Sequence, residues 1–188
     1  MKTRSREDEN VSYKSDGTQM DCSHDDKPVW QGYLSLVIRT VVFVFVIFLI
    51  FTQVLFLKRV RGVEMFPSLK DGDLALGFRL EREYHSGDVV LYEADGNLHF
   101  GRILSLGGST VNISGNGSVQ INGVTESGEI VFPTDDPGTL DYPYQVPEGS
   151  YFILGDYRTE KEDSRIFGAI PKDSIKGKVI SILRRRGL

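Results

Sequence analysis

The sequence predicts a mainly β domain of antiparallel sheets, preceded by one N-terminal transmembrane helix. A long apolar run ends near residue 57, and short segments rich in β-branched and aromatic residues follow it. Clusters of Gly, Asn and Asp separate these segments. The chain has 188 residues, a formal net charge of −4 and one cysteine. This length allows one modest domain beside the apolar run, and a single cysteine excludes an intramolecular disulfide.

Residues 1–33 are polar and charged, and they are predicted to form a flexible tail. Such a segment buries too little apolar surface to offset the entropy lost on ordering. Residues 34–57 are predicted to form the transmembrane anchor, because a span needs about 20 mostly apolar residues. The only charge in the run from Leu36 to Leu57 is Arg39, near one end. No small-residue cleavage site follows, so the run is predicted to stay attached.

The charges that flank the apolar run leave its orientation open. Lys58, Arg59 and Arg61 follow the run, whereas Lys27 and Arg39 lie near its other end. The positive-inside rule therefore leans slightly towards a cytoplasmic C-terminal side.

Residues 58–188 are predicted to form the β domain. Asp95-Gly96 and Asn116-Gly117 are dipeptides typical of hairpin turns. Residues 133–147, rich in Pro, Asp, Gly and Tyr, are predicted to form an irregular loop. The predicted strands are 74–78, 88–93, 97–106, 110–114, 118–121, 151–154 and 178–183.

Several function classes find no support in the sequence. No basic face points to a nucleic-acid partner. There is no glycine loop for phosphate and no Cys/His cluster with zinc spacing, so neither a cofactor nor a metal is expected.

The segment that follows the apolar run carries the most specific motif. It extends from Gly62 to Asp73 and reads GVEMFPSLKDGD. It resembles the nucleophile motif of the type I signal peptidases, Gly-x-Ser-Met-x-Pro-Thr-Leu-x-x-Gly-Asp. Glu64 stands where this family carries its catalytic serine, and Ser68 replaces the threonine.

Three further segments resemble motifs of the same family, in the same order. Ser86 to Val90 resembles the Gly-Asp-x-Val motif, and His99 to Ile103 resembles the motif of the catalytic lysine, whose position is Gly101. Gly155 to Gly168 resembles Gly-Asp-Asn-Arg-x-x-Ser-x-Asp-Ser-Arg-x-x-Gly, with departures at Tyr157 and Lys161. The residues kept from this motif, and expected to be structural, include Gly155, Asp156, Arg158, Asp163, Ser164 and Arg165.

The resemblance implies a Ser/Lys dyad in which a desolvated lysine activates the serine. Glu64 and Gly101 occupy both dyad positions, and losing such a unit costs on the order of 10⁶-fold in rate. The sequence therefore predicts a degenerate family member that is not an enzyme, with no catalytic residue. The alternative is an active type I signal peptidase, a serine-type endopeptidase that cleaves signal peptides with an altered dyad.

The resemblance further implies a signal-peptidase-like protein of Gram-positive bacteria, of the pilus-associated type. The predicted function is that of a non-catalytic pilus assembly factor or chaperone for secreted pilin precursors. A sortase or an active signal peptidase are further partners that it implies, and an accessory subunit of an active paralogue is a third hypothesis. The implied location is the cell membrane, with a single span, a cytoplasmic N-terminus and an extracellular C-terminal domain.

The same resemblance predicts a groove for an extended peptide. Met65, Phe66 and Pro67 follow the nucleophile position and are expected to line this groove. A groove of this kind binds a strand through main-chain hydrogen bonds. Contacts with the core or the membrane surface are the alternative for Met65 and Phe66.

Other residues are weaker candidates for replacing the dyad. Ser68 is more typical of a turn-stabilising hydroxyl than of a nucleophile, and Lys161 has no recognisable serine to act on. A pair of Glu64 with Asp163, of the aspartic-protease kind, is a remote alternative. His85 and His99 are more typical of surface or strand residues than of catalysts.

The last prediction concerns the space expected at Gly101, where the lysine is missing. Glu64 and Lys161 are predicted to form an ion pair across this space, because an unpaired buried carboxylate is costly. The alternative is that Lys161 points to solvent between Glu160 and Glu162.

Overall fold

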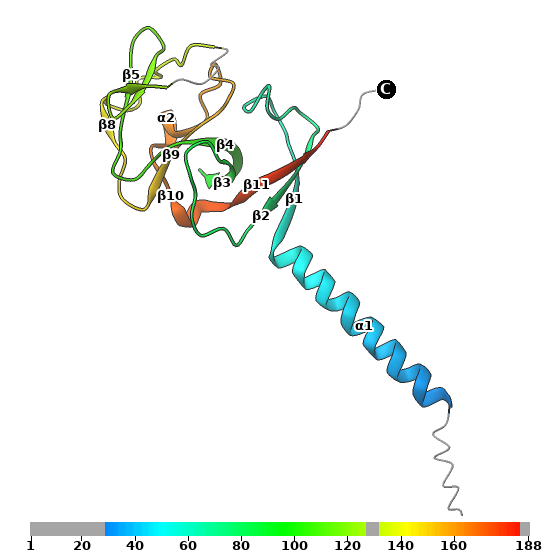
Figure 1. Cartoon of the computed structure of the whole chain (residues 1–188). Coiled ribbons are helices and arrows are strands. Elements are labelled where there is room, and N and C mark those ends of the chain that lie inside the picture. The colour runs from blue at the N-terminus through cyan, green and yellow to red at the C-terminus, as the bar shows by residue number, and fades with distance from the viewer. Residues whose placement is uncertain (1–28, 127–131, 185–188) are drawn as a thin grey trace, which may run out of the picture. The chain divides into compact units, whose positions relative to one another are not determined.

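The computed structural model describes residues 29–126 and 132–184, and Figure 1 shows the chain. The tail predicted over residues 1–33 falls largely outside the described residues. Its last residues are helical, because helix α1 begins at Val29 and extends to Gln53.

Helix α1 is long and apolar enough to cross a membrane. The most apolar stretch of 18 residues within Gly32–Gln53 has a mean hydropathy of 2.8, and none of this stretch is buried by protein. These residues extend over about 33 Å at 1.5 Å per residue, close to the ~30 Å hydrocarbon core of a bilayer. The helix ends before residue 57, where the anchor was predicted to end, because Leu55–Arg59 form strand β1.

The β domain has two antiparallel sheets in the part of the chain that the structure describes. The order of the larger sheet is β1-β2-β11-β3-β4-β9-β10, and Figure 1 shows β11 between β2 and β3. Its strands are β1 Leu55–Arg59, β2 Leu74–Phe78, β3 Val89–Ala94, β4 Asn97–Leu106, β9 Ser150–Leu154, β10 Ile170–Pro171 and β11 Ile175–Leu183.

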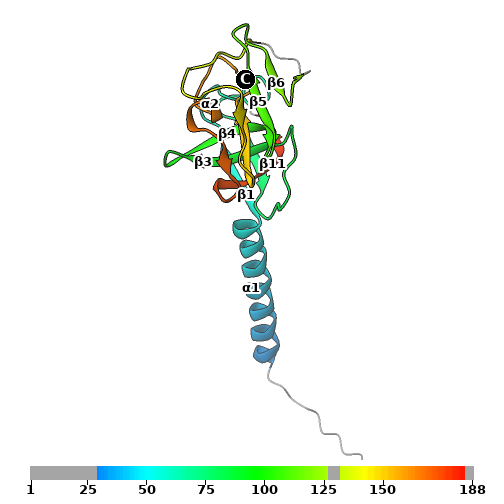
Figure 2. The same cartoon turned by 90° about the vertical axis from the view of Figure 1, so that its left-hand side faces the viewer.

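The smaller sheet has the order β7-β6-β5-β8. Figure 2 shows β5 and β6 together at one end of the β domain. Its strands are β5 Thr110–Ile113, β6 Val119–Ile121, β7 Val124–Thr125 and β8 Tyr144–Gln145. The two short helices are α2 Ser164–Phe167 and the 3₁₀ helix Lys172–Ser174.

The prediction of a mainly β fold after one apolar helix is confirmed. Strands β2 and β4 have the predicted bounds, and Asp95-Gly96 forms the turn between β3 and β4 with positive φ at both residues. Strands β7, β8 and β10 were missed because two residues are too few for a sequence pattern. Strand β1 was missed because its leucines and phenylalanine continue the apolar run.

Strand β1 is held by one aromatic side chain that covers two glycines. Phe56 is 5% exposed, and it packs with Met65, Leu69 and other residues of one hydrophobic cluster. A Cβ atom at Gly77 would lie 2.1 Å from Phe56 Cζ, and one at Gly177 would lie 2.8 Å from Phe56 Cε1. The glycines of β2 and β11 thus leave the space that the ring fills, so Phe56 binds β1 to the sheet.

The two sheets share a second hydrophobic cluster. Leu104 of β4 and Phe152 and Leu154 of β9 pack against Val111 and Val119 of the smaller sheet. This cluster joins the smaller sheet to β4 and β9.

Replacing Phe56 with alanine is expected to lower the free energy of unfolding by about 3–5 kcal/mol, because it opens a cavity over two glycines that nothing else fills. Chemical denaturation of the full chain in detergent micelles measures this change. Leu57→Ala is the matched control: the neighbouring side chain is exposed, so we expect a change near 0.5 kcal/mol. Equal losses in the two variants would contradict this account of β1.

Candidate active site

Glu64 lies in the loop between β1 and β2, and backbone hydrogen bonds close this loop. Val60 N donates to Asp73 O at 2.8 Å, and Gly72 N donates to Val60 O at 3.0 Å. The side chain of Met65 is buried in the core beneath the loop. These contacts fix the loop on both sides of Glu64.

The first and last motifs meet at the backbone of Glu64. Tyr157 N donates to the carbonyl oxygen of Glu64 at 2.9 Å. A Cβ atom at Gly155 would lie 2.6 Å from the same oxygen, which no other residue type could accommodate without movement. Glycine at position 155 therefore permits the close approach of the two motifs.

Arg102 joins all four motifs. Its Nε and Nη2 donate to the two carboxylate oxygens of Asp156 at 2.7 and 2.6 Å. Its Nη1 donates to Gly87 O at 2.8 Å, and Nη2 also reaches Ser68 Oγ at 3.2 Å. Bidentate pairs of this kind fix geometry as well as adding energy. Ser68 is thus engaged by a structural cation, as expected for a hydroxyl that stabilises the loop.

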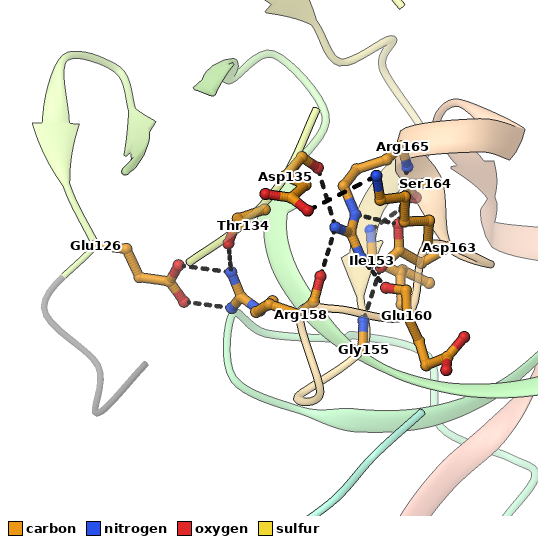
Figure 3. Close-up of polar contacts among 11 residues, drawn as sticks. Glu126, Thr134, Asp135, Ile153, Gly155, Arg158, Glu160, Asp163, Ser164 and Arg165 are labelled. Atoms are coloured by element: carbon orange, nitrogen blue, oxygen red, sulfur yellow. Dashed lines mark hydrogen bonds and ion pairs between the residues drawn. The ribbon is translucent and has the colours of Figure 1, made fainter. Parts of the chain in front are cut away.

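A second buried pair, between Asp163 and Arg165, organises the last motif (Figure 3). The carboxylate of Asp163 accepts from Arg165 N, Nε and Nη2 and from Gly155 N, at 2.8–3.1 Å. Arg165 is fully buried. Its remaining donors reach the carbonyl oxygens of Asp135, Arg158 and Glu160. Because the whole fork is satisfied, this charge can be buried at acceptable cost.

Two neighbours complete this framework. The hydroxyl of the buried Ser164 accepts from Ile153 N at 2.9 Å. Arg158 donates to both carboxylate oxygens of Glu126 and to Thr134 Oγ1 (Figure 3). The kept residues of the last motif thus bind the framework together rather than facing a substrate.

The ion pair predicted between Glu64 and Lys161 is not formed. Lys161 Nζ lies 3.7 Å from Asp135 Oδ2 at the surface. The space expected at Gly101 does not exist, because a Cβ atom there would lie 2.4 Å from Ile153 Cγ2 and 3.1 Å from Tyr92 Cε1. The lysine stem therefore has no cavity to fill.

Glu64 lies instead beside His99 and Glu162. His99 Nδ1 is 4.0 Å from Glu64 Oε1. One ligand atom from each of Glu64, His99 and Glu162 lies within 4.8 Å of the others. His99 is 7% exposed, and its ring packs between Tyr92 and Phe167 with centroid separations of 5.7 and 5.3 Å.

The environment of Glu64 disfavours its charge. Burial, together with the negative charges of Glu162, Glu160 and Asp163, raises the pKa of Glu64 from 4.5 to about 7. Both carboxylate oxygens of Asp163 accept hydrogen bonds from Arg165 and Gly155, so Asp163 is engaged away from Glu64. The carboxylate beside Glu64 in this site is that of Glu162, not that of Asp163.

A cleft of about 550 Å³ opens beside Glu64. Strand β1 forms one side of this cleft and β4 another. Since β1 pairs only with β2 in the described sheet, its other edge is free for main-chain pairing. The lining residues are Lys58, Arg59, Arg61, Glu64, Leu91, Gly96, Asn97, Leu98 and Phe100.

The three residues expected to line a groove differ in position. Met65 is 1% exposed and packs in the core, which was the alternative given for this residue. Phe66 is 40% exposed and packs edge-on against Tyr157, with ring centroids 6.3 Å apart. Pro67 is exposed. The groove itself remains a prediction for Phe66 and Pro67.

His99 was expected to be a surface or strand residue and lies on strand β4, whereas the sequence did not single out Glu162. His99 precedes Gly101 by two residues on β4, so both point to the same face of the sheet. That spacing was the available signal for His99. Glu162 gave no signal, because an exposed loop places it beside Glu64. His85 is a surface residue, 4.0 Å from Asp88.

The family is shown by comparison with known proteins. Residues 33–183 match the signal peptidase family, peptidase S26, and the chain belongs to this family. Signal peptidase I of Bacillus licheniformis is 33% identical over 132 residues, which cover 63% of this chain and 70% of that protein. Signal peptidase IB of Staphylococcus aureus is 30% identical over 144 residues, covering 64% of this chain and 73% of that protein.

Among solved structures, a signal peptidase I from Enterococcus faecalis V583 aligns with a TM-score of 0.43 and 27% identity. The alignment covers 53% of this chain and 98% of that chain.

The prediction that this chain is not an enzyme is contradicted, because the relatives that it matches are named signal peptidase I and signal peptidase IB. That prediction rested on the loss of both dyad residues, at positions 64 and 101. The sequence did not reveal that the side chains of His99 and Glu162, which can donate or accept protons, lie beside Glu64.

Replacing Asp163 with alanine is expected to cost about 3–5 kcal/mol, because it leaves the buried guanidinium of Arg165 without its counter-charge. Denaturant titration of the full chain measures the loss. The control is Asp135→Ala, which removes only an exposed pair with Lys161 and should change stability by about 0–1 kcal/mol. A small loss for Asp163→Ala would show that Arg165 does not depend on this carboxylate.

Replacing Gly101 with alanine is expected to destabilise the fold by about 1–3 kcal/mol through overpacking against Ile153. Gly101→Lys, made together with Glu64→Ser, should destabilise the fold for the same reason. Gly115→Ala is the matched control, since nothing lies within 4 Å of its added Cβ, and it should stay within about 0.5 kcal/mol. Thermal unfolding compares the three variants with the parent, and an unchanged Gly101→Ala protein would contradict the close packing.

Proposed function

We propose that this protein is a membrane-anchored signal peptidase that processes secreted precursor proteins at the cleft beside Glu64. Membership of the signal peptidase family supports this reading, as do the names of the relatives. The observation that carries it is the cleft itself, which sets Glu64 between a free strand edge and the strand that holds His99.

The anchor in this proposal is the apolar part of α1, and the processing domain begins at β1. We infer that the N-terminus is cytoplasmic and the β domain extracytoplasmic, because a cleft for precursors is useful where translocated chains emerge. The charges after the helix, which favour the opposite orientation, include Lys58 and Arg59. In this proposal those two residues instead line the substrate cleft.

Substrate binding in this proposal uses the edge of β1. An extended precursor segment would add to this edge through main-chain hydrogen bonds, with its alternate side chains directed into the cleft. Leu98 and Phe100 provide apolar surface there. Such binding selects extended, unfolded segments. The region around a signal-peptide cleavage site must itself be extended to reach a peptidase.

The chemistry available at Glu64 differs from that of a Ser/Lys dyad. Carboxylates and imidazole act as general acids and bases, so the nucleophile they can activate is water. The water oxygen would bond to the scissile carbonyl carbon, the carbon–nitrogen bond would break, and a proton would pass to the leaving amine. Glu64, His99 and Glu162 are the groups close enough together to direct these proton transfers.

The more specific roles predicted from the sequence remain predictions. Pilin precursors are one class of secreted substrate, and a sortase or a second signal peptidase would be further partners in pilus assembly. The described residues carry no feature that selects a pilin over another precursor.

Cleavage by the full chain tests the proposal. Reconstituted in lipid vesicles with a precursor that carries its signal peptide, the protein should release the mature protein, and Glu64→Ala should abolish release. Mass spectrometry of the product locates the cleaved bond. Glu83→Ala, an exposed carboxylate outside the cleft, is the control and should retain the parent rate.

Absence of cleavage by the parent protein, with the precursor bound, would overturn the peptidase proposal. Equal cleavage by Glu64→Ala and parent would show that position 64 is not the reacting centre.

A further inference from the structure

The cluster of Glu64, His99 and Glu162 has the composition of a metal site. It offers two carboxylate oxygens and one imidazole nitrogen, all within 4.8 Å of one another. The three side chains come from separate parts of the chain, namely the loop before β2, strand β4 and the loop before α2. The three ligands are therefore brought together by the fold and do not come from a local run of acidic residues.

The second observation is that the buried imidazole of His99 lacks hydrogen-bond partners. His99 is 7% exposed, yet neither of its ring nitrogens has a hydrogen-bond partner in the protein. Buried polar atoms are almost always paired, and leaving one unpaired costs about 1–3 kcal/mol. Nδ1 of this ring lies 4.0 Å from Glu64 Oε1, too far for a hydrogen bond. The unpaired nitrogen and the nearest carboxylate thus leave a gap between them.

The hydroxyl of Tyr92 adds to this picture. Tyr92 is fully buried, its ring stacks on His99, and its oxygen also lacks a partner. Unpaired polar atoms thus lie on two side chains whose rings stack, and one of these, His99, is a member of the cluster. In the rest of the described chain, unpaired buried side-chain atoms belong only to Ser105 and Tyr142.

The size of the gap suits a transition-metal ion. Zinc binds nitrogen and carboxylate oxygen at about 2.0–2.2 Å, so two tetrahedral ligands lie about 3.4 Å apart. The His99–Glu64 separation of 4.0 Å exceeds that value by about 0.6 Å, and the other two separations, within 4.8 Å, exceed it by about 1.4 Å at most. Glu162 is exposed and can adjust its side chain, whereas the ring of His99 is held between Tyr92 and Phe167.

We propose that Glu64, His99 and Glu162 form a binding site for a divalent transition metal, with Zn²⁺ as its first candidate. The single imidazole and the two carboxylates suit Zn²⁺ or Mn²⁺, whereas Mg²⁺ prefers oxygen ligands and retains its water.

The site bears on the reaction through its ligand number. Three protein ligands leave a fourth position for water, as in catalytic zinc sites, and a bound metal lowers the pKa of that water towards 7. A metal held there would supply the activated water that the missing serine and lysine do not. This consequence rests on the proposed peptidase function, whereas the metal site itself does not.

Metal binding is measured on the full chain in detergent micelles after treatment with a chelator and its removal. Titration calorimetry with Zn²⁺ should show one equivalent bound, and Zn²⁺ should raise the melting temperature by several degrees, because it binds the folded state only. Mn²⁺ should bind more weakly than Zn²⁺, as the usual affinity order requires. Mg²⁺ should give no shift.

Variants assign the ligands. Glu64→Gln, His99→Phe and Glu162→Gln should each weaken Zn²⁺ binding at least 10-fold, and His99→Phe keeps the aromatic packing so that the protein stays folded. Glu160→Gln and His85→Gln are the matched controls, which change a neighbouring carboxylate and a surface imidazole and should bind as the parent does. Co²⁺ in place of Zn²⁺ reports ligation by its visible absorption, independently of any activity.

The absence of a Zn²⁺-dependent shift in the parent, or equal binding by the three ligand variants, would overturn the metal site. One equivalent of Zn²⁺ bound without precursor cleavage would support the site and overturn the peptidase proposal. Cleavage that persists after complete removal of the metal would support the peptidase and overturn the metal's part in it.

Discussion

The pair between Arg102 and Asp156 is the interaction on which the site depends. From one guanidinium, hydrogen bonds reach the loop of Glu64, the turn before β3 and the start of the last motif. Arg102 can do this because β4 is a central strand with partners on both sides. The planar guanidinium is pre-organised and loses little entropy for each hydrogen bond it forms, which makes arginine suited to this role. The four motifs are therefore one structural unit, although the chain separates them widely.

This framework compensates for the unfavourable burial of one side chain, the carboxylate of Glu64. Glu64 is a half-buried carboxylate near other negative charges, and its raised pKa records that cost. The Asp163–Arg165 pair, with its donors satisfied, supports the loop beside it. Functional sites often carry such locally unfavourable groups while the surrounding structure compensates. Glu64 and Gly101 thus depart from the family motifs, whereas the framework that supports these two positions is in place.

The sequence predicted the fold well and the centre poorly, for physical reasons. Strands such as β4 show alternation and turn dipeptides, which are local signals. The motifs, likewise, are local strings, so the family was recognised from them. By contrast, the contact of Glu64 with His99 and Glu162 depends on a loop, a strand and a second loop meeting in space. The failed pair of Glu64 with Lys161 shows the same limit: sequence could not reveal that Ile153 and Tyr92 fill the space at Gly101.

The free edge of β1 also affects how copies of this protein behave towards one another. An unpaired strand edge can template aggregation, because its free N–H and C=O groups can form hydrogen bonds with any extended chain, including the same strand of another molecule. Lys58 and Arg59 are exposed on β1, so two such edges brought together would set like charges side by side. Repulsion between these charges opposes edge-to-edge association of two copies in the membrane, whereas a neutral or acidic chain meets no such repulsion. Lys58 and Arg59 thus disfavour self-association through β1 and still allow a different chain to bind there.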